Sequence, residues 1–408
     1  MHLCSALIDR LRKDVLNLGE IGRQVTGGIS RPSLSEYDVE ARKYVLKTFR
    51  EAGLRVFTDA AGNMIGVRSG EVESPIVTTG SHIDSVWNGG MFDGVLGVMG
   101  GLEAIRMLND DGVRTKLPIA LIVFTDEEGA FSSLTGSSYF AGVLERQALY
   151  DLKNKYDGRR FGEGVTRIPR EGYVERFTRP IRAHVELHIE QGPVLEANRV
   201  DIGVVTGIVG IRWLNISFKG RQSHAGATPM NMRRDPAIPL ARTTLKIREI
   251  ALKHGDMVGT TGHITLFPNV ANVIPGEASL VGDIRSLEAA DLEDAVGRVV
   301  RSAKIYAKRE NVDLEYSIPQ KTEPVNCSPL VIHTISKVVE ELGYSYMQLP
   351  SRAGHDTQNM AKLTGEVGMV FVPSRGGVSH APEEWTEWEQ AHRGVEVLRK
   401  TLIRLANQ

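Results

Sequence analysis

The length, composition and charge of the chain exclude several classes of protein. Its 408 residues exceed what one hydrophobic core usually holds, so we expect two domains. Hydrophobic residues at 41% and charged residues at 24% are typical of a globular protein and not of a disordered one. Because 49 Lys and Arg residues balance 50 Asp and Glu residues, the chain lacks the global basic field that recruits nucleic acid or a membrane surface.

Neither a targeting signal nor a disulfide framework is predicted. Charged residues interrupt the first 20 positions, and no apolar run approaches the roughly 18 residues that a membrane span requires. The only cysteines, Cys4 and Cys327, are too few for a disulfide framework. We therefore expect a soluble, cytoplasmic protein in which both thiols are inert.

The first part of the chain alternates between helical and strand-like patterns. A capping signature, Ser35-x-x-Asp38, begins a helix that Gly53 ends. The pattern then predicts strands at 76–79, 118–124 and 183–189, and helices at about 94–108 and 133–146. This alternation is typical of an α/β sheet, whose ligands bind outside the carboxyl ends of the strands.

The middle of the chain follows a different pattern. It predicts, in order, strand 211–219, helix 236–253, strands 261–267 and 278–285, helix 289–308 and strand 313–318. This order is the βαββαβ unit of a ferredoxin-like domain, whose sheet edge or helices can pair with a second copy. The α/β pattern then returns, with a strand at 366–372. We therefore predict a mixed-sheet catalytic domain over 1–209 and 322–408, and an inserted dimerisation domain over 210–321.

The strand at 76–79 is followed by residues with metal-ligand chemistry. His82 emerges at the strand end, and Asp84 lies two residues on, where its carboxylate can accept the second N–H of the imidazole. A single pair of this kind is more often a surface turn. Asp93 follows a glycine-rich segment at the start of a helix, so it is either an N-cap or a carboxylate that bridges two ions.

Three consecutive acids, Asp126, Glu127 and Glu128, follow the strand at 118–124. Their mutual repulsion is costly unless cations lie nearby, although a solvated acidic turn is the alternative. Adjacent side chains of an extended segment point in opposite directions, so one carboxylate can bind metal while the other moves a proton. We predict Glu128 as the ligand and Glu127 as the catalytic base.

Further imidazoles follow two other strands. Along 183–189 the period of two places His184, Glu186 and His188 on one face. His380 lies in a glycine-rich loop after the strand at 366–372, where a histidine alone indicates little. Together these histidines and carboxylates form a nitrogen and oxygen donor set that suits zinc, manganese, cobalt or nickel.

Six segments, in the correct order, resemble the two-metal aminoacylase and carboxypeptidase superfamily. They are GSHIDSVWNGGMFDG (80–94), FTDEEGAFSSLTGS (124–137), HIEQGPVLE (188–196), SHAGATPM (223–230), AGHDTQNM (353–360) and GGVSHAPEEWT (376–386). Within that superfamily the chain is similar to the branch of N-carbamoyl-L-amino acid hydrolases, allantoate amidohydrolases and β-ureidopropionases. The resemblance covers nearly the whole chain and implies two divalent metal ions per subunit.

The resemblance also implies the metal ligands. His82 and His188 bind one ion, Glu128 and His380 bind the other, and Asp93 bridges the two. Asp84 is the expected carboxylate behind His82. Peptidases of the superfamily have a carboxylate where this chain has His188, which argues against a general peptidase.

Two catalytic roles follow from the same similarity. Glu127 removes a proton from the attacking water and passes it to the leaving nitrogen. His224 stabilises the oxyanion by reaching into the site of the partner subunit; without the resemblance it is equally well a surface histidine.

The substrate residues implied by the resemblance are Gln191, Asn272, Arg285 and Gly354, together with His224. Asn272 and Arg285 form a clamp on the substrate carboxylate, for which the planar guanidinium of arginine is suited. The predicted reaction is hydrolysis of N-carbamoyl-L-α-amino acids to the amino acid, carbon dioxide and ammonia, in a homodimer.

The rival functions are allantoate amidohydrolase, β-ureidopropionase and metal-dependent dipeptidase. A catalytically silent metal-binding dimer is a further alternative, but a structural metal site does not need Glu127. A nucleic-acid or membrane partner is not expected, because the charge is balanced.

Overall fold

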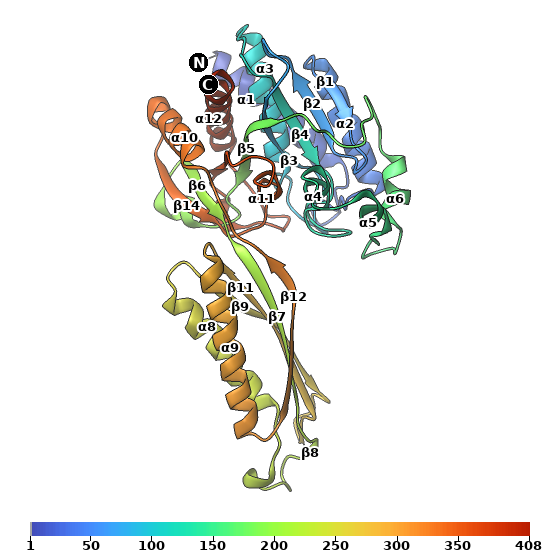
Figure 1. Ribbon diagram of the computed structural model, residues 1–408, viewed down its shortest axis with the longest axis vertical. Helices are drawn as coiled ribbons and strands as arrows, with labels where there is room; N and C mark the ends of the chain where they lie inside the picture. Colours follow the sequence, from blue (N-terminus) through green and yellow to red (C-terminus); the bar gives the residue numbers. More distant parts are fainter. Residues whose placement is uncertain (1) are drawn as a thin grey trace. The chain divides into compact units, whose positions relative to one another are not determined.

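The computed structural model describes the backbone of residues 2–408 and the side chains of residues 8–408, so the side chain of Cys4 lies outside the described part. The chain forms two compact units, shown in Figure 1. Unit 1 comprises residues 1–206 and 327–408, and unit 2 comprises residues 207–326. The predicted boundaries, 209/210 and 321/322, fall close to these. None of the described helices has the length and apolar character needed to cross a membrane.

Unit 1 is built on a mixed β-sheet. Its strands are β1 (Arg55–Thr58), β2 (Met64–Arg68), β3 (Ile76–His82), β4 (Ile119–Phe124), β5 (Ile181–Ile189), β6 (Ile202–Ile208), β14 (Tyr346–Ser351) and β15 (Val367–Val372). The order is β1-β2-β4-β3-β5-β15-β6, and β14 also pairs with β6. The central strands β4, β3, β5 and β15 are parallel to one another. Their completely buried apolar runs explain the strand predictions at 76–79, 118–124, 183–189 and 366–372.

Long helices cover this sheet. They are α1 (His2–Glu20), α2 (Glu36–Glu51), α3 (Val95–Asp110), α10 (Pro329–Leu342) and α12 (Trp388–Asn407). α3 and α12 pack against each other and against β5. Ser35 caps α2 as predicted, because its side chain accepts the N–H of Asp38. The chain also forms short helices, namely α4 (Thr135–Phe140), α5 (Arg146–Asp151), α6 (Phe161–Gly164), α7 (Val194–Asn198) and α11 (Thr357–Met360).

One predicted helix is wrong in extent. The helix expected over 133–146 ends at Phe140, and α5 begins only at Arg146. Between them Gly142 has a φ of 74°, a left-handed conformation that ends a helix.

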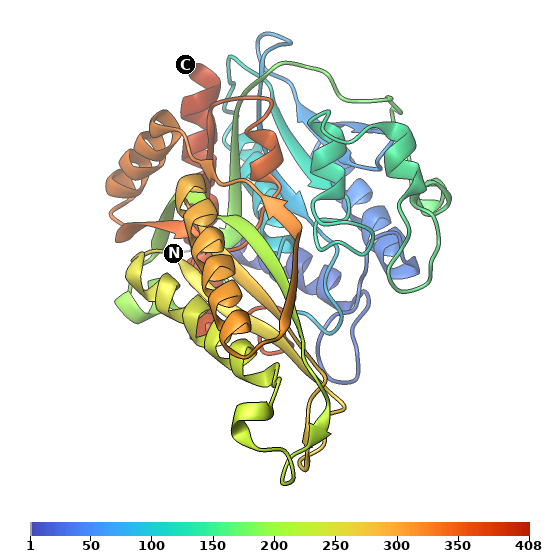
Figure 2. The same cartoon turned by 60° about the horizontal axis from the view of Figure 1, so that its bottom comes forward.

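Unit 2 confirms the predicted ferredoxin-like fold. Its main elements are β7 (Gly210–Lys219), α8 (Ala237–Lys253), β9 (Val258–Phe267), β11 (Glu277–Ser286), α9 (Ala289–Arg309) and β12 (Asp313–Thr322). The strands form an antiparallel sheet in the order β12-β7-β11-β9. α8 and α9 lie side by side against this sheet (Figure 2). Alternate residues of β7, such as Leu214, Ile216 and Phe218, are buried in the core of the unit.

A second, smaller sheet extends unit 2. It consists of β8 (Ser223–His224) and β10 (Val273–Ile274), which pair so that His224 lies opposite Val273. A further short strand, β13 (Val325–Asn326), pairs with the end of β6.

Candidate metal centre

The predicted metal ligands converge because their strands are parallel. His82 is the last residue of β3 and lies opposite Phe124, the last residue of β4. His188 lies near the end of β5, opposite Phe371 of β15. The loops that follow these strands therefore begin at the same edge of the sheet, where an open α/β sheet binds its ligands.

Asp93 lies at the centre of the cluster. One of its oxygens, Oδ1, is 3.2 Å from Nε2 of His188 and 3.9 Å from Nε2 of His82. The other, Oδ2, is 3.1 Å from Nε2 of His380. The N-cap alternative for Asp93 is excluded, because Gly94 is the N-cap residue of α3 and no side chain caps that helix. The two oxygens face two different sets of imidazoles, as in a carboxylate that bridges two ions.

Of the three donor groups that the described residues form, two share Asp93, and the third consists of Glu186, His188 and His355. The first group is His82, Asp93 and His188, and the second is Asp93, Glu128 and His380. Within each group the candidate ligand atoms all lie within 4.8 Å of one another. A set of imidazole and carboxylate donors without thiolate fits zinc, manganese, cobalt or nickel. The residues present therefore fit two divalent ions.

Backbone carbonyls orient both buried imidazoles. Nδ1 of His82 donates a hydrogen bond to the carbonyl oxygen of Asp84 (3.0 Å). Nδ1 of His188 donates to the carbonyl oxygen of Ile189 (2.9 Å). Each ring therefore directs Nε2 towards Asp93, which is the nitrogen that a metal ligand must present.

The pKa values of three residues in the cluster are raised, which favours their protonated forms. Burial, followed by the charge of Asp93, raises the pKa of Glu128 to about 8. Burial acts to lower the pKa of His188, but the hydrogen bond to Asp93 and the charges of Asp93 and Glu186 together outweigh it and raise that pKa to about 9. The hydrogen bond to Asp93 likewise raises the pKa of His380 to about 9. Bound cations would neutralise the same carboxylates and displace these protons.

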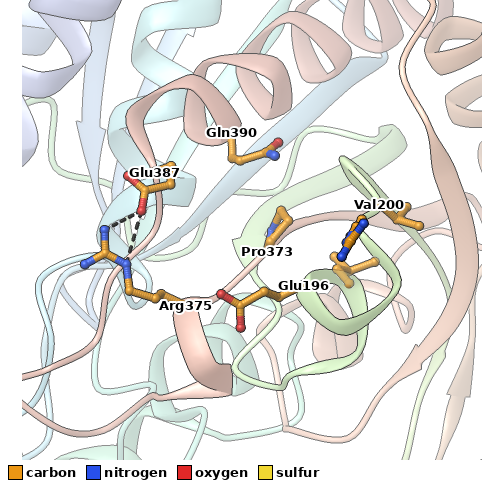
Figure 3. A pocket seen from close by; sticks show the side chains of 8 residues that line it. Glu196, Val200, Pro373, Arg375, Glu387 and Gln390 are labelled. Carbon is orange, nitrogen blue, oxygen red and sulfur yellow. Dashed lines mark hydrogen bonds and ion pairs between the residues drawn. The ribbon is translucent and has the colours of Figure 1, made fainter.

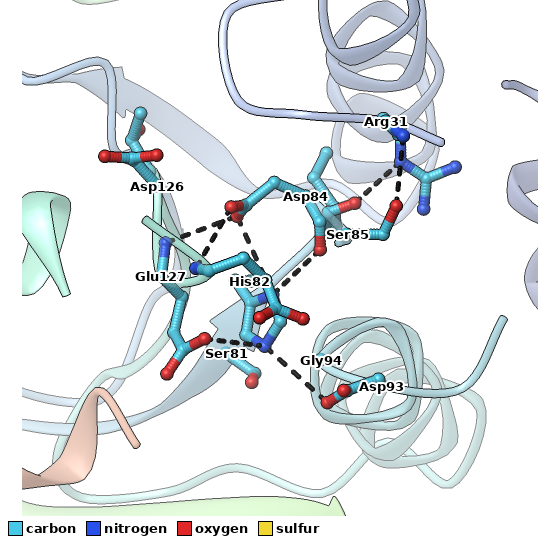
Figure 4. A network of polar contacts seen from close by, with 12 residues as sticks. Arg31, Ser81, His82, Asp84, Ser85, Asp93, Gly94, Asp126 and Glu127 are labelled. Atoms are coloured by element: carbon cyan, nitrogen blue, oxygen red, sulfur yellow. Dashed lines mark hydrogen bonds and ion pairs between the residues drawn. The ribbon is translucent and has the colours of Figure 1, made fainter. Parts of the chain in front are cut away.

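The three consecutive acids have separate environments. The Asp126 carboxylate accepts the N–H groups of Phe131 (3.2 Å) and Ser132 (3.1 Å), so it stabilises the loop. Glu127 places Oε2 3.6 Å from Nε2 of His82, and Figure 4 shows it pointing towards that ring while Asp126 points away. Oε1 of Glu128 is 3.5 Å from Nε2 of His380. Their side chains are nearly inaccessible to solvent, so the acidic-turn alternative is wrong.

Burial dominates the electrostatics of Glu127. It raises the pKa of this carboxyl group well above its usual range, and the neighbouring charges of Glu128 and Asp356 add to the effect. A carboxylate in such a place binds a proton more strongly than an exposed one does. This is the property that a general base next to two ions requires.

Asp84 lies next to His82, but its carboxylate does not accept the hydrogen bond from the imidazole that its spacing in the sequence predicted. Its carboxylate Oδ1 is 3.6 Å from Nδ1 of His82, beyond hydrogen-bond distance. The same carboxylate accepts the N–H groups of Glu127 (3.4 Å) and Glu128 (3.2 Å). Asp84 therefore connects the loop after β3 to the loop after β4, as the dashed lines in Figure 4 show.

Sequence reasoning missed two buried residues that fix these loops. Arg31 is 1% exposed and donates from Nε to the carbonyl oxygen of Ile83 (2.6 Å). Glu384 is 2% exposed and accepts the N–H groups of Phe92 and Asp93. Both act on backbone groups of distant segments, so no local pattern could have identified them.

Two predicted substrate residues lie beside the cluster. Gln191 donates from Nε2 to Oδ2 of Asp93 (3.0 Å). Gly354 immediately precedes His355, whose ring packs edge-on against His188 with 4.6 Å between the ring centres. The structure therefore brings both into the surroundings of the predicted metal ligands.

The other predicted substrate residues belong to unit 2. His224 accepts the N–H groups of Gly226 (3.0 Å) and Ala227 (3.1 Å) at Nδ1, and its side chain is exposed. The N–H of Ala225 donates to the carbonyl oxygen of Asn272 (3.0 Å). His224 and Asn272 thus lie side by side on the small β8–β10 sheet.

Arg285 lies at the opposite end of the main sheet of unit 2. The loop that carries Asn272 returns to β11 at Glu277, and Arg285 lies eight residues further along that strand. At about 3.3 Å per residue, these eight residues span roughly 26 Å. Asp283 holds Arg285 there by hydrogen bonds to Nε (3.0 Å) and Nη2 (2.8 Å). Asn272 and Arg285 of one copy therefore cannot contact the same carboxylate.

A shallow pocket of about 240 Å³ lies at the base of the segment that carries His380 (Figure 3). It is lined by Leu195, Glu196, Arg199, Val200, Pro373, Arg375, Glu387 and Gln390. Arg375 forms an ion pair with Glu387, and the N–H of Gly376 donates to Oε2 of Glu196 (2.6 Å). These contacts fasten the outer side of the segment and do not reach the metal ligands.

Comparison with known proteins agrees with this site. Residues 78–404 match Peptidase family M20/M25/M40. The chain is 40% identical to an N-carbamoyl-L-amino acid amidohydrolase of Geobacillus stearothermophilus, over 98% of each chain. It is 35% identical to a ureidoglycolate hydrolase of Arabidopsis thaliana, over 97% of this chain and 86% of the relative.

A solved structure is similar over the same length. It is an amidase of the hydantoinase/carbamoylase family from Burkholderia multivorans, with a TM-score of 0.92 and 35% identity over 98% of each chain. Proteins of the M20 family depend on metal ions, and the two donor groups around Asp93 could hold them. The chain belongs to Peptidase family M20/M25/M40, within its hydantoinase/carbamoylase branch, as an amidohydrolase that acts on C–N bonds.

Proposed function

We propose that the protein hydrolyses N-carbamoyl-L-α-amino acids to the free amino acid, carbon dioxide and ammonia. The observation that carries this proposal is the full-length similarity to the Geobacillus stearothermophilus N-carbamoyl-L-amino acid amidohydrolase. The position of His188 supports it, because the peptidases that this chain resembles have a carboxylate there.

In this proposal the five donors hold two divalent ions. His82, Asp93 and His188 hold one, and Asp93, Glu128 and His380 hold the other. When bound, such ions polarise the ureido carbonyl group and lower the pKa of the attacking water. Nδ1 of His82 and of His188 stays on a backbone carbonyl throughout, so Nε2 keeps its orientation.

Glu127 moves the proton. Its carboxylate accepts the proton of the attacking water and delivers it to the leaving nitrogen as the C–N bond breaks. The position of Glu127 next to His82 and its raised pKa support this role. Asp84 holds the backbone of Glu127 and thereby keeps the carboxylate in place.

Unit 2 binds the substrate in this proposal, and it does so from two copies of the chain. His224 and Asn272 lie together at one end of the unit, and Arg285 lies at the other. A substrate carboxylate held by both Asn272 and Arg285 therefore needs one residue from each subunit of a homodimer. His224 then enters the site together with the Asn272 of the same subunit.

The test is ammonia release by metal-loaded protein with a panel of substrates. The panel comprises N-carbamoyl-L-methionine, its D-enantiomer, allantoate, ureidoglycolate, N-carbamoyl-β-alanine and a dipeptide, with chelator-treated protein as the control. Selective turnover of the L-carbamoyl compound is expected. Preference for allantoate or ureidoglycolate would replace the substrate but leave the site unchanged, and no turnover of any compound by protein with two bound ions would support the catalytically silent alternative.

A further inference from the structure

Glu384 is a buried acid that does not belong to the two proposed groups of metal ligands. Its Oε1 accepts the N–H groups of Phe92 and Asp93, both at 3.0 Å. Its Oε2 accepts the hydroxyl of Ser379 at 2.9 Å. Both oxygens are therefore engaged, and neither is free to coordinate an ion.

These bonds connect two segments that carry metal ligands. Phe92 and Asp93 precede α3, whereas Ser379 is the neighbour of His380, almost 290 residues away in sequence. Ser379 also lies beside Asp93, with 3.4 Å between its Oγ and Oδ2 of Asp93. Glu384 is thus a buried link between the Asp93 loop and the His380 segment, in addition to the direct contact of Asp93 with His380.

The packing around Glu384 leaves room for this carboxyl group and little else. A Cβ atom at Gly90 would lie 2.1 Å from the carboxyl carbon of Glu384, so any side chain at position 90 would displace it. The absence of a side chain at Gly90 therefore leaves the space that the Glu384 carboxyl group occupies.

His380 depends on such a link more than the other ligands do. Its side chain is 49% exposed, whereas those of His82 and His188 are 3% and 1% exposed. It lies in a loop, with a φ of 57°, and no strand fixes it. The outer contacts at Arg375 and Gly376 hold only the start of the segment.

We propose that Glu384 is a positioning residue of the metal centre, which clamps the His380 segment to the Asp93 loop and so sets the affinity for the ion held by Asp93, Glu128 and His380. The inference rests on the metal centre of the proposed function and not on its substrate. The ion held by His82 and His188 depends less on the clamp, because it shares Asp93 but keeps two further ligands on buried strands.

The direct test is the Glu384→Ala variant. Its metal-free form is titrated stepwise with Co²⁺, and binding is measured by calorimetry and visible absorption. Mass spectrometry measures the metal content. Loss of such an outer hydrogen-bonding partner lowers metal affinity about 10- to 100-fold. We expect this loss in one of the two binding steps and a clearly smaller one in the other, because Asp93 is common to both donor groups. Equal loss in both steps, or unchanged affinity in both, would overturn the inference.

Two further variants separate the clamp from folding and from charge. Glu384→Gln keeps an acceptor for Phe92 and Asp93 and can donate to Ser379, so its affinity should recover to within about tenfold of the wild type. If it binds as weakly as Glu384→Ala, the hydrogen bonds are not the cause. Glu383→Ala removes the same charge from the exposed neighbouring residue and should leave both steps unchanged. A wild-type protein that binds fewer than two ions would instead overturn the proposed metal centre.

Discussion

The two units differ in how they supply residues to the proposed site. In unit 1, the predicted ligands of both metal groups lie within one chain, and most are buried at the ends of parallel strands. In unit 2, His224 and Asn272 lie at one end of the domain and Arg285 at the other. The metal centre can therefore form in a single copy, whereas the proposed substrate clamp needs two.

Burial of the charged site residues follows the same division. In unit 1 the side chains of Asp84, Asp93 and Glu127 are 1%, 6% and 12% exposed, and the charges of Asp84 and Asp93 help to raise the pKa of Glu127. The predicted substrate residue His224 of unit 2 is exposed to solvent. We therefore expect substitutions of site residues in unit 1 to alter metal binding and stability. Substitutions of site residues in unit 2 should alter substrate binding and assembly.

The largest expected effect is that of Glu127→Gln in unit 1. Loss of a general base lowers turnover by about 10²- to 10⁴-fold, and kcat should fall within this range. The amide is nearly the same size, and Glu127 is not a proposed ligand, so the metal content should stay at two ions. Steady-state kinetics and metal analysis of the same sample check both statements.

Glu128→Gln is the matched control for this substitution. It changes the adjacent acid in the same way but removes a proposed ligand, so metal content should fall along with activity. Unchanged kcat in Glu127→Gln would remove this residue from the mechanism.

The next largest effect tests whether unit 2 works across subunits. Asn272→Ala and Arg285→Ala should each lower kcat/KM by at least about tenfold, because hydrogen bonds to a charged group are lost. If the two are refolded together in equal amounts, half of the dimers are mixed, and each mixed dimer contains one intact site. Activity should then return to about one quarter of the wild-type value.

A second mixture provides the control for complementation. His224→Ala and Asn272→Ala change residues at the same end of unit 2, so no mixed dimer has an intact site and activity should stay low. Recovery in this mixture, or none in the first, would show that the clamp is not divided between subunits as proposed.

A smaller effect is expected from pH on the metal-free protein. The pKa of Glu128 is raised to about 8 and that of His188 to about 9, both above the values in an unfolded chain. Groups with a raised pKa stabilise the folded state below their unfolded pKa, and this stabilisation is lost as pH rises through the folded value.

The melting temperature of metal-free protein should therefore fall by about 5 °C between pH 7 and pH 9.5. Metal-loaded protein should change much less, because the ions replace the protons at these residues. Differential scanning calorimetry of both forms measures this, and a flat or rising melting temperature without metal would contradict it.

The fold could be predicted where local periodicity carries the information. The alternation of Leu214, Ile216 and Phe218 indicated a half-buried strand, and the order of such elements indicated the ferredoxin-like unit. The pairing of β1 with β2, and of β2 with β4, was not predicted, because strand order depends on contacts between distant segments. The helix at 133–146 was predicted too long, since the effect of Gly142 depends on its φ angle.

The candidate site, like the fold, was predicted where local sequence patterns determine it and missed where distant segments meet. Glu127 and Glu128 have different surroundings, as predicted. The extended segment on which that prediction rested is absent, because Asp126 has a φ of 61° and both glutamates lie in a bend. The carboxylate of Asp84 was expected to orient His82, yet it binds the backbone N–H groups of two residues more than 40 positions away. Contacts of this kind leave no spacing in the sequence, which is also why Glu384 was missed.

The smallest expected effect comes from an exposed ion pair of unit 2. Nζ of Lys219 lies 2.9 Å from Oε1 of Glu315, and the two side chains are 47% and 67% exposed. Solvent screens such a pair, and ordering two long side chains offsets most of its attraction. Lys219→Ala should therefore leave the urea midpoint of the metal-loaded protein unchanged within error.

The buried pair of Arg42 and Asp38 in unit 1 is the reference for this measurement. Both side chains are fully buried, and Arg42 also donates to Thr125, which precedes the three acids at the end of β4. Arg42→Ala leaves the Asp38 carboxylate without its cation in the interior, so the urea midpoint should fall clearly. If Lys219→Ala lowered the midpoint as much as Arg42→Ala does, the contrast between the buried ion pair of unit 1 and the exposed ion pair of unit 2 would not hold for stability.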